Sequence, residues 1–318
     1  MRLPRPRLAS CSAPVRRALA CTALLPAAAC VVVRSTRPAQ PQRVSHAFAE
    51  TAGGRVTARS AADSTCDADR NARGWGRARA TYCEVRTFAL DAPAGGVTVD
   101  AGADGGVTAR GADTARRVTV AATVRTWART ADEARRIAEA VRVAADDSGT
   151  VRATGPARHD WERDGWWSVS YALTLPARAS LAARTNNGDL RVAGVAGRLR
   201  LDTNNGNVML DAVGGDVVAR TNNGGVRATL AGRTWDAAGL ADAGLDLRTN
   251  NGGAVVRVPA GYSARLSVGT NNGGLTVDFP VAVQGRLDRR RLDVTLGGGG
   301  APVRVFSNNG GARLARAE

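Results

Sequence analysis

The sequence predicts an all-β protein, specifically a parallel β-helix or β-solenoid with TNNG turns, coils of roughly 18–21 residues and one short α-helix in its N-terminal half. Three observations predict this class. A Thr-Asn-Asn-Gly tetrapeptide recurs, apolar residues alternate at fixed distances on both sides of it, and only 4% of the residues are aromatic. Alternation with a period of two is typical of strands with one buried face.

The tetrapeptide occurs six times at intervals of 18, 18, 28, 21 and 37 residues, which indicates one unit with insertions between some copies. Its first residues are Thr185, Thr203, Thr221, Thr249, Thr270 and Ser307. In every copy, the residues four and two positions before this residue, and five and seven after it, are apolar. Each unit therefore has two strands joined at the tetrapeptide, where Asn and Gly favour a tight turn. We expect a positive φ at Gly206 and Gly224.

Two arrangements fit this unit: an antiparallel meander with hairpin turns, and a coil in which each repeat stacks in parallel on the preceding one. The coil is favoured because the insertions leave the apolar positions in phase and because the turn keeps its asparagines. Identical stacked amides can form a hydrogen-bonded ladder. The predicted turn ladder consists of Asn186, Asn204, Asn222, Asn250, Asn271 and Asn308.

Residues 1–33 predict a signal peptide, because arginines precede sixteen uncharged residues that contain small side chains before a cleavage site. Ala27 and Ala29 form an A-x-A cleavage site. Cys30 follows it directly, so a lipoprotein box with lipidation at Cys30 is the alternative, although Ala27 stands where Leu is usual. Residues 34–59 have the composition of a linker. We therefore expect an extracytoplasmic protein, located in the periplasm, on the outer membrane surface or secreted.

Residues 60–180 predict a β-rich N-terminal region, and residues 181–318 the TNNG-repeat region. The segments "GGVTVDAGADGGVTARG" and "RRVTVAATVRTWART" are strand-like and are candidates for degenerate early coils. One helix is expected near 131–144, capped by Thr130 or Asp132.

Two cysteines, Cys66 and Cys83, remain after the signal peptide. In an oxidising compartment, an isolated pair predicts a disulfide, with two free buried thiols as the alternative. The two histidines, His46 and His159, are far from both cysteines in sequence and form no ligand-spaced cluster. We therefore predict no metal site and no cofactor.

The formal charge of +16 does not predict nucleic-acid binding. Eight of the 44 basic residues lie in residues 1–46, which contain no acid, so 36 basic and 28 acidic residues remain, a charge of +8. Basic runs with interleaved aromatics are absent. The residue before the turn is Arg184, Asp202, Arg220 or Arg248 in the first four copies. Parallel stacking places Asp202 between two arginines, which favours a charge ladder on a solvated face; a binding face of Arg184, Arg220 and Arg248 is the alternative.

Several segments combine in a specific order: "YCEVRTFAL", "GGVTVDAG", "GWWSVSY", the repeated "TNNGG", "VPAGYSARL", "DFPVAVQGRL" and "LGGGGAPVRV". Together they resemble the bacterial DUF4097 family, whose members are called putative adhesin domains, over roughly residues 60 to 316. The resemblance implies an exported, β-helical, non-enzymatic envelope protein. The adhesin label is itself an analogy from fold, so it implies little about mechanism.

The sequence thus predicts an exported, non-enzymatic cell-envelope protein, an adhesin-like surface or scaffold module that acts through a repetitive face. An envelope glycan or envelope protein would fit such a face, and membrane contact is expected only through an N-terminal lipid anchor. A polysaccharide-active enzyme is one alternative, but it needs converging acids, and the column Asp189, Asn207, Gly225 does not keep its acid. An envelope-stress or signalling component that binds a protein partner is the other.

Overall fold

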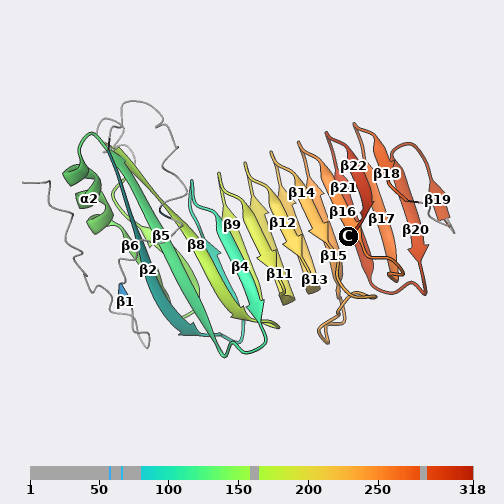
Figure 1. The fold of residues 1–318 in the computed structure, drawn as a ribbon, viewed down its shortest axis with the longest axis horizontal. Helices are drawn as coiled ribbons and strands as arrows, with labels where there is room; N and C mark the ends of the chain where they lie inside the picture. Colours follow the sequence, from blue (N-terminus) through green and yellow to red (C-terminus); the bar gives the residue numbers. More distant parts are fainter. Residues whose placement is uncertain (1–56, 59–65, 67–79, 158–164, 280–284, 318) are drawn as a thin grey trace, which may run out of the picture. The chain divides into compact units, whose positions relative to one another are not determined.

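The computed structural model describes residues 57–58, 66, 80–157, 165–279 and 285–317, and all of them lie in the compact unit Arg43–Glu318. The described chain is mostly β-strand, with the helix α2 (Ala131–Ala140) and two sheets of eleven strands each, A and B (Figure 1). The predicted signal peptide, Cys30, His46 and His159 lie outside the described residues, and so does the predicted linker 34–59 except for Thr57 and Ala58, which form a short strand.

Each sheet combines a run of strands from the repeats with strands from the N-terminal region. In spatial order, sheet A consists of β1 (Thr57–Ala58), β2 (Ala80–Asp91), β5 (Arg117–Ala128), β8 (Gly165–Pro176), β4 (Val107–Ala112), β10 (Leu190–Ala193), β12 (Val208–Asp211), β14 (Val226–Thr229), β16 (Ala254–Val258), β22 (Ala312–Arg316) and β18 (Leu275–Val277). Sheet B consists of β19 (Gly285–Leu287), β20 (Arg291–Leu296), β17 (Ala264–Thr270), β21 (Pro302–Ser307), β15 (Gly244–Thr249), β13 (Gly214–Thr221), β11 (Ala196–Thr203), β9 (Leu181–Thr185), β3 (Val97–Asp100), β7 (Thr150–Thr154) and β6 (Arg142–Ala145).

The strand before each TNNG turn lies in sheet B, and the strand after it lies in sheet A. Equivalent strands pair in parallel and in register; Leu199, for example, lies opposite Leu181 on one side and Val217 on the other. An up-and-down meander would pair them antiparallel. Alternate side chains point inward and form a core of Val, Leu and Ala between the sheets, as the apolar columns of the sequence indicate.

The coils do not stack in chain order throughout. The last one, β21 and β22, lies between the coil of β15 and β16 and the coil of β17 and β18. The expectation that each repeat stacks on the preceding one is therefore wrong for the final two. Beyond β17, the antiparallel strands β20 and β19 complete sheet B. The β19–β20 hairpin thus lies at the end of sheet B, where a stack in chain order would place the last coil.

The parallel stack also begins before residue 181. Strands β3 and β4 pair in parallel with β9 and β10, so the "GGVTVDAGADGGVTARG" segment occupies the position of a first coil although it lacks the tetrapeptide. The second strand-like segment does not: it forms β5, which pairs antiparallel with β2 along twelve residues and with β8 along ten. The expected division at residue 180 therefore cuts the stack after its first coil.

The helix α2 is shorter than the expected range of 131–144. Thr130 caps it in a capping box, in which the Glu133 amide donates to Thr130 Oγ1 (3.2 Å) and the Thr130 amide donates to Glu133 Oε2 (3.1 Å). The helix ends at Ala140 because Val141 adopts an extended conformation (φ −72°, ψ 129°) and is fully buried. Strand β6 follows at once and pairs with β7.

The turn glycines are required by close approach and not by a positive φ. Gly206 and Gly224 are absent from the described residues with positive φ, which corrects the sequence-based expectation. A Cβ on Gly206 would lie 1.9 Å from the carbonyl oxygen of Gly188 in the neighbouring coil. That carbonyl also accepts a hydrogen bond from the buried hydroxyl of Thr203 (2.9 Å). The turn therefore needs a hydroxyl at its first position and no side chain at its fourth.

Candidate functional site

The edge of the stack carries two continuous ladders of asparagine side chains. In both, neighbouring coils of the stack are joined by a hydrogen bond from the Nδ2 of one asparagine to the Oδ1 of its equivalent, over 2.8–3.1 Å in the first ladder and 2.7–2.9 Å in the second. The first ladder runs through Asn186, Asn204, Asn222, Asn250, Asn308 and Asn271. The second runs through Asn187, Asn205, Asn223, Asn251, Asn309 and Asn272.

Only the first ladder was predicted from the sequence, although the tetrapeptide contains both asparagines. The second ladder ends on a carboxylate, because Asn187 Nδ2 donates to Asp104 Oδ1 (2.8 Å) in the first coil. An acceptor-only group fits the end toward which all the amide donors point. The signal that could have revealed this cap is the alignment of "GADGG" with "TNNGG".

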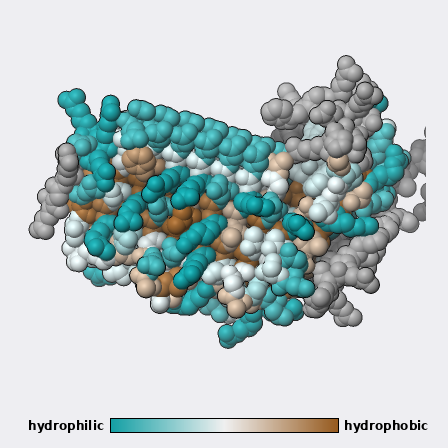
Figure 2. Space-filling model, turned by 180° about the vertical axis from the view of Figure 1, so that it is seen from behind, coloured by the Kyte–Doolittle hydropathy of each residue, from teal (hydrophilic) through white to brown (hydrophobic). Residues whose placement is uncertain are grey.

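The ladders leave part of their hydrogen-bonding capacity unused. An Asn side chain has two N–H donors and an oxygen with two lone pairs, and a ladder position uses one of each. All of the ladder side chains except Asn308 are exposed. Figure 2 shows a continuous hydrophilic row along one edge of the molecule. The edge can therefore present one N–H and one acceptor site per amide, repeated at the strand spacing of about 4.8 Å.

The arginines of the predicted binding face lie beside this edge, on the outer face of sheet B, in different electrostatic settings. Arg184 Nη2 pairs with Asp100 Oδ2 (2.7 Å), and Arg248 makes two contacts with Asp246 (2.8 and 2.9 Å), which raise the pKa of Arg248. Asp202 lies opposite both Arg184 and Arg220 in register. Arg184 nevertheless pairs with Asp100 of β3, a partner that the repeat pattern does not indicate.

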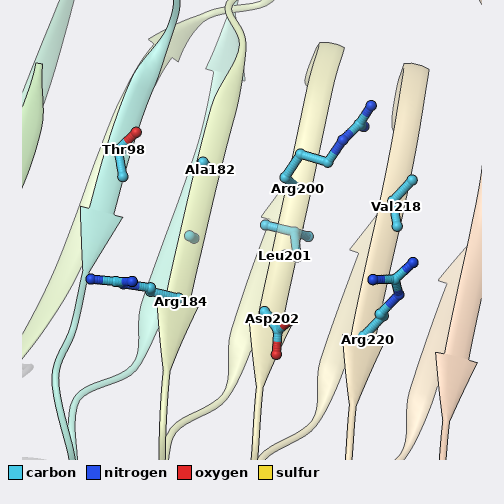
Figure 3. A pocket seen from close by; sticks show the side chains of 9 residues that line it. Thr98, Ala182, Arg184, Arg200, Leu201, Asp202, Val218 and Arg220 are labelled. Carbon is cyan, nitrogen blue, oxygen red and sulfur yellow. The ribbon is translucent and has the colours of Figure 1, made fainter. Parts of the chain in front are cut away.

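A shallow groove of about 240 Å³ lies between these side chains. Its lining residues are Thr98, Ala182, Ala183, Arg184, Arg200, Leu201, Asp202, Val218 and Arg220 (Figure 3). Arg200 also pairs with the Asp216 carboxylate. Ala182 and Val218 lie opposite Arg200 on its two sides, and Asp202 lies between Arg184 and Arg220. The groove therefore combines an apolar lining with charged side chains whose charges are largely balanced.

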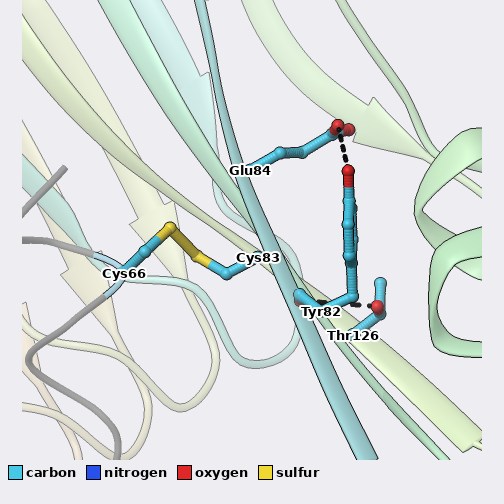
Figure 4. Close-up of a disulfide and its surroundings, with 5 residues drawn as sticks. All are labelled: Cys66, Tyr82, Cys83, Glu84 and Thr126. Carbon is cyan, nitrogen blue, oxygen red and sulfur yellow. Dashed lines mark hydrogen bonds between the residues drawn. A yellow bond between two sulfur atoms is a disulfide. The ribbon is translucent and has the colours of Figure 1, made fainter. Parts of the chain in front are cut away.

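Cys66 and Cys83 are joined by a disulfide, with their Cα atoms 5.9 Å apart (Figure 4). Cys83 lies on β2, which pairs with β5 along its length. The bond therefore attaches Cys66 to the long antiparallel part of sheet A. On either side of Cys83 in the sequence, the Tyr82 hydroxyl donates to Glu84 Oε2 (3.3 Å).

The acid column at the turns and the buried phenols bear on the enzyme alternative. No group of three His, Cys, Asp or Glu side chains suited to a metal ion is present among the described residues. The Asp189 carboxylate accepts hydrogen bonds from the amide and side chain of Asn207 (2.9 and 3.1 Å), and Asn207 Oδ1 accepts from the Gly225 amide (2.9 Å). The column Asp189, Asn207 and Gly225, where the enzyme alternative needs acids, thus forms a third line of hydrogen bonds between neighbouring turns. Burial raises the pKa of Tyr171 and raises that of Tyr262 to about 12, so both phenols stay protonated at neutral pH.

Comparisons with known proteins leave the function open. No family model matches the chain, and no curated protein matches it. A solved structure described as a putative cell adhesion protein from Clostridium sporogenes aligns with 75% of this chain and 100% of its own, at 9% identity and a TM-score of 0.37. A putative adhesin from Bacteroides fragilis aligns with 77% of this chain and 100% of its own, at 10% identity and a TM-score of 0.26. At these TM-scores, neither likeness carries an argument about function.

Within the described part of the chain, no helix combines the length and the apolarity that a bilayer span requires.

Proposed function

We propose that the chain is an exported, non-enzymatic protein of the cell envelope, an adhesin-like or scaffold module that binds a repetitive partner through the amide edge of a β-solenoid. The observation that carries the proposal is the pair of continuous, exposed asparagine ladders. The parallel, in-register pairing of the coils supports the β-solenoid class. The resemblance to DUF4097 is compatible with this function and remains a prediction from the sequence.

The amide edge suits many weak contacts better than one deep site. Each exposed amide keeps one donor and one acceptor after its ladder bonds, and a single neutral hydrogen bond to a partner contributes only about 1 kcal/mol. Repetition changes this balance, because a partner held at one point meets the next contact at a high effective concentration. A partner with regularly spaced hydroxyls or amides, such as an envelope glycan or an extended segment of an envelope protein, fits such a row.

Arg184 and Arg220 flank the edge and offer charge to the same partner. Both are exposed and line the groove on sheet B. Replacing both with Gln should leave the fold nearly intact, because exposed ion pairs contribute about 0–1 kcal/mol. It should weaken attachment to immobilised envelope material from the native host and make that attachment less sensitive to salt.

Arg198→Gln/Arg304→Gln is the matched control. Both residues are exposed on sheet B, and neither lines the groove. Attachment of the folded Arg184→Gln/Arg220→Gln variant at the wild-type level would contradict the binding role of this face. A pull-down from the native envelope with the tagged chain would identify the partner class.

Export is tested separately. N-terminal sequencing of the protein from its native host should give a mature chain that begins near Cys30 or shortly after it. Mass spectrometry of the same peptide distinguishes a lipidated Cys30 from an unmodified N-terminus. A cytosolic protein that begins at Met1 would end the export argument.

A further inference from the structure

A second groove, on the outer face of sheet A, has a different charge from the groove described above. It measures about 370 Å³. It is lined by Arg227, Val255, Arg257, Asp278, Arg313, Ala315, Arg316 and Ala317. Four arginines thus face one carboxylate. In the groove on sheet B, by contrast, Arg184 and Arg200 also pair with Asp100 and Asp216, two carboxylates beside the lining, so its charge is largely balanced.

The strand register explains how these arginines surround a small floor. Val255 on β16 lies opposite Arg227 on β14 and opposite Arg313 on β22. Arg257, two residues along β16 on the same face, lies opposite Ala315. A short side chain therefore alternates with a long basic one across the strands. The two arginines that flank Val255 are two strand spacings apart, or about 10 Å.

Among the described residues, only one of the four arginines in this groove is paired with a carboxylate. Arg313 pairs with Asp278 (2.6 Å between Nη2 and Oδ2), and the Arg316 guanidinium lies over the Phe279 ring, 5.4 Å from its centroid. Arg227 and Arg257 make no ion pair or side-chain hydrogen bond with any residue that the structure describes. Earlier in the same sheet, by contrast, Arg191 pairs with Asp189 (2.5 Å).

We propose that this basic groove of sheet A binds the phosphate groups of an anionic polymer. Guanidinium groups bind phosphate oxygens through paired N–H donors, and Arg227 and Arg257 donate none of theirs to another residue of the described chain. Arg313 and Arg316 are held in place by Asp278 and Phe279 and keep further donors, so the groove is partly ordered before binding.

The arrangement favours a polymer over a membrane surface. The arginines come from three neighbouring strands, β14, β16 and β22, so the groove runs across the strands, along the direction in which the coils stack. A chain with successive phosphates can follow that direction. Interfacial membrane binding requires apolar or aromatic side chains that enter the bilayer, and the only aromatic ring beside the groove, Phe279, is half-buried under Arg316 in the described structure.

The test measures the binding of sodium tripolyphosphate and of long-chain polyphosphate to the full chain by isothermal titration calorimetry at two salt concentrations. Arg227→Gln/Arg257→Gln should raise the Kd for the polymer about tenfold or more. Arg198→Gln/Arg304→Gln removes the same charge from sheet B and should change the Kd less than about twofold, because charges beyond the Debye length are screened. Asp278→Asn removes the single carboxylate and should lower the Kd about threefold.

Circular dichroism establishes that each variant is folded. An equal loss of binding in both double variants would overturn the groove and leave only net charge, and so would the absence of polyphosphate binding by the wild type. Binding to phosphatidylglycerol vesicles without binding to polyphosphate would overturn the polymer as the source of the phosphates. The Asp278→Asn result keeps the proposal falsifiable if the arginine double variant fails to fold.

Discussion

The tightest contact in the repeat gives the sharpest prediction about stability. Gly206→Ala should destabilise the fold although the φ of Gly206 is not positive. The added Cβ would lie 1.9 Å from the carbonyl oxygen of Gly188 and 2.5 Å from its carbon, where contacts below 3.0 Å are essentially never seen. Both atoms belong to the backbone of the neighbouring coil, so the two coils must separate locally by about 1 Å.

Two costs follow from that separation. The hydrogen bond from Thr203 Oγ1 to the Gly188 carbonyl, 2.9 Å long, is lost, and Thr203 is only 1% exposed. A buried hydroxyl without a partner costs about 1–3 kcal/mol. Overpacking adds about 1–3 kcal/mol, and the smaller conformational entropy of Ala in the unfolded chain offsets about 0.4–1 kcal/mol. The free energy of unfolding should therefore fall by about 3 kcal/mol.

Gly225→Ala is the matched control one coil further on. A Cβ there meets nothing closer than 3.4 Å, and the φ of Gly225 is not positive. Its unfolding free energy should stay within about 0.5 kcal/mol of the wild type. Urea unfolding followed by circular dichroism measures both variants. Equal midpoints for Gly206→Ala and Gly225→Ala would refute the close-approach explanation of the turn.

Three further predictions concern the disulfide, the phenols and the ladder. Thiol labelling of the denatured, unreduced protein should find neither Cys66 nor Cys83 reactive, and reduction should lower the stability by about 2–4 kcal/mol; labelling of both before reduction would exclude the bond. Burial raises the pKa of Tyr262 from 10.0 to about 12, so its contribution to stability is complete below pH 10 and is lost as the pH rises towards 12; phenolate absorbance of folded Tyr262 at pH 10 would contradict this. Asn204→Asp/Asn222→Asp should lower the melting temperature at neutral pH and less at acidic pH, because two carboxylates then stand about 5 Å apart; equal melting at both pH values would refute the repulsion.

The mostly β class with one helix was predictable, because local patterns determine it. Apolar residues at constant offsets from each tetrapeptide specify which side chains share a column, and Leu181, Leu199 and Val217 do lie in register. The capping sequence from Thr130 to Glu133 places the start of the helix. Its end was not predictable from the same pattern, because Val141 is buried by tertiary packing and fits an apolar helix stripe equally well.

The partners of charged residues were less accessible to sequence reasoning. Arg184 pairs with Asp100, a residue 84 positions earlier in a coil that lacks the tetrapeptide. The turn glycines show a related limit. A glycine requirement has two physical sources, a positive φ and a close backbone approach, and the sequence alone does not separate them. A glycine needed for either reason looks the same in the TNNG motif. Only the Gly188 backbone, stacked against Gly206, shows that close approach is the reason here.

The order of the coils is the largest feature that the sequence did not reveal, and it can be tested by mutation. Equivalent columns determine which residues align, but any coil can stack on any other. Leu314 lies between Val256 and Val277 in sheet A, so the last coil is an interior one. In a stack that followed chain order, it would be the terminal coil, with one neighbour only.

Leu314→Ala should therefore cost as much as Leu210→Ala, about 2–5 kcal/mol. Leu314 is fully buried and Leu210 is 2% exposed, and both occupy the same position after the turn with a coil on each side. A terminal coil relaxes around a lost side chain and costs less to truncate, since it contacts a single neighbour. Urea unfolding compares the two variants directly. A cost for Leu314→Ala well below that of Leu210→Ala would show that the last coil does not lie inside the stack.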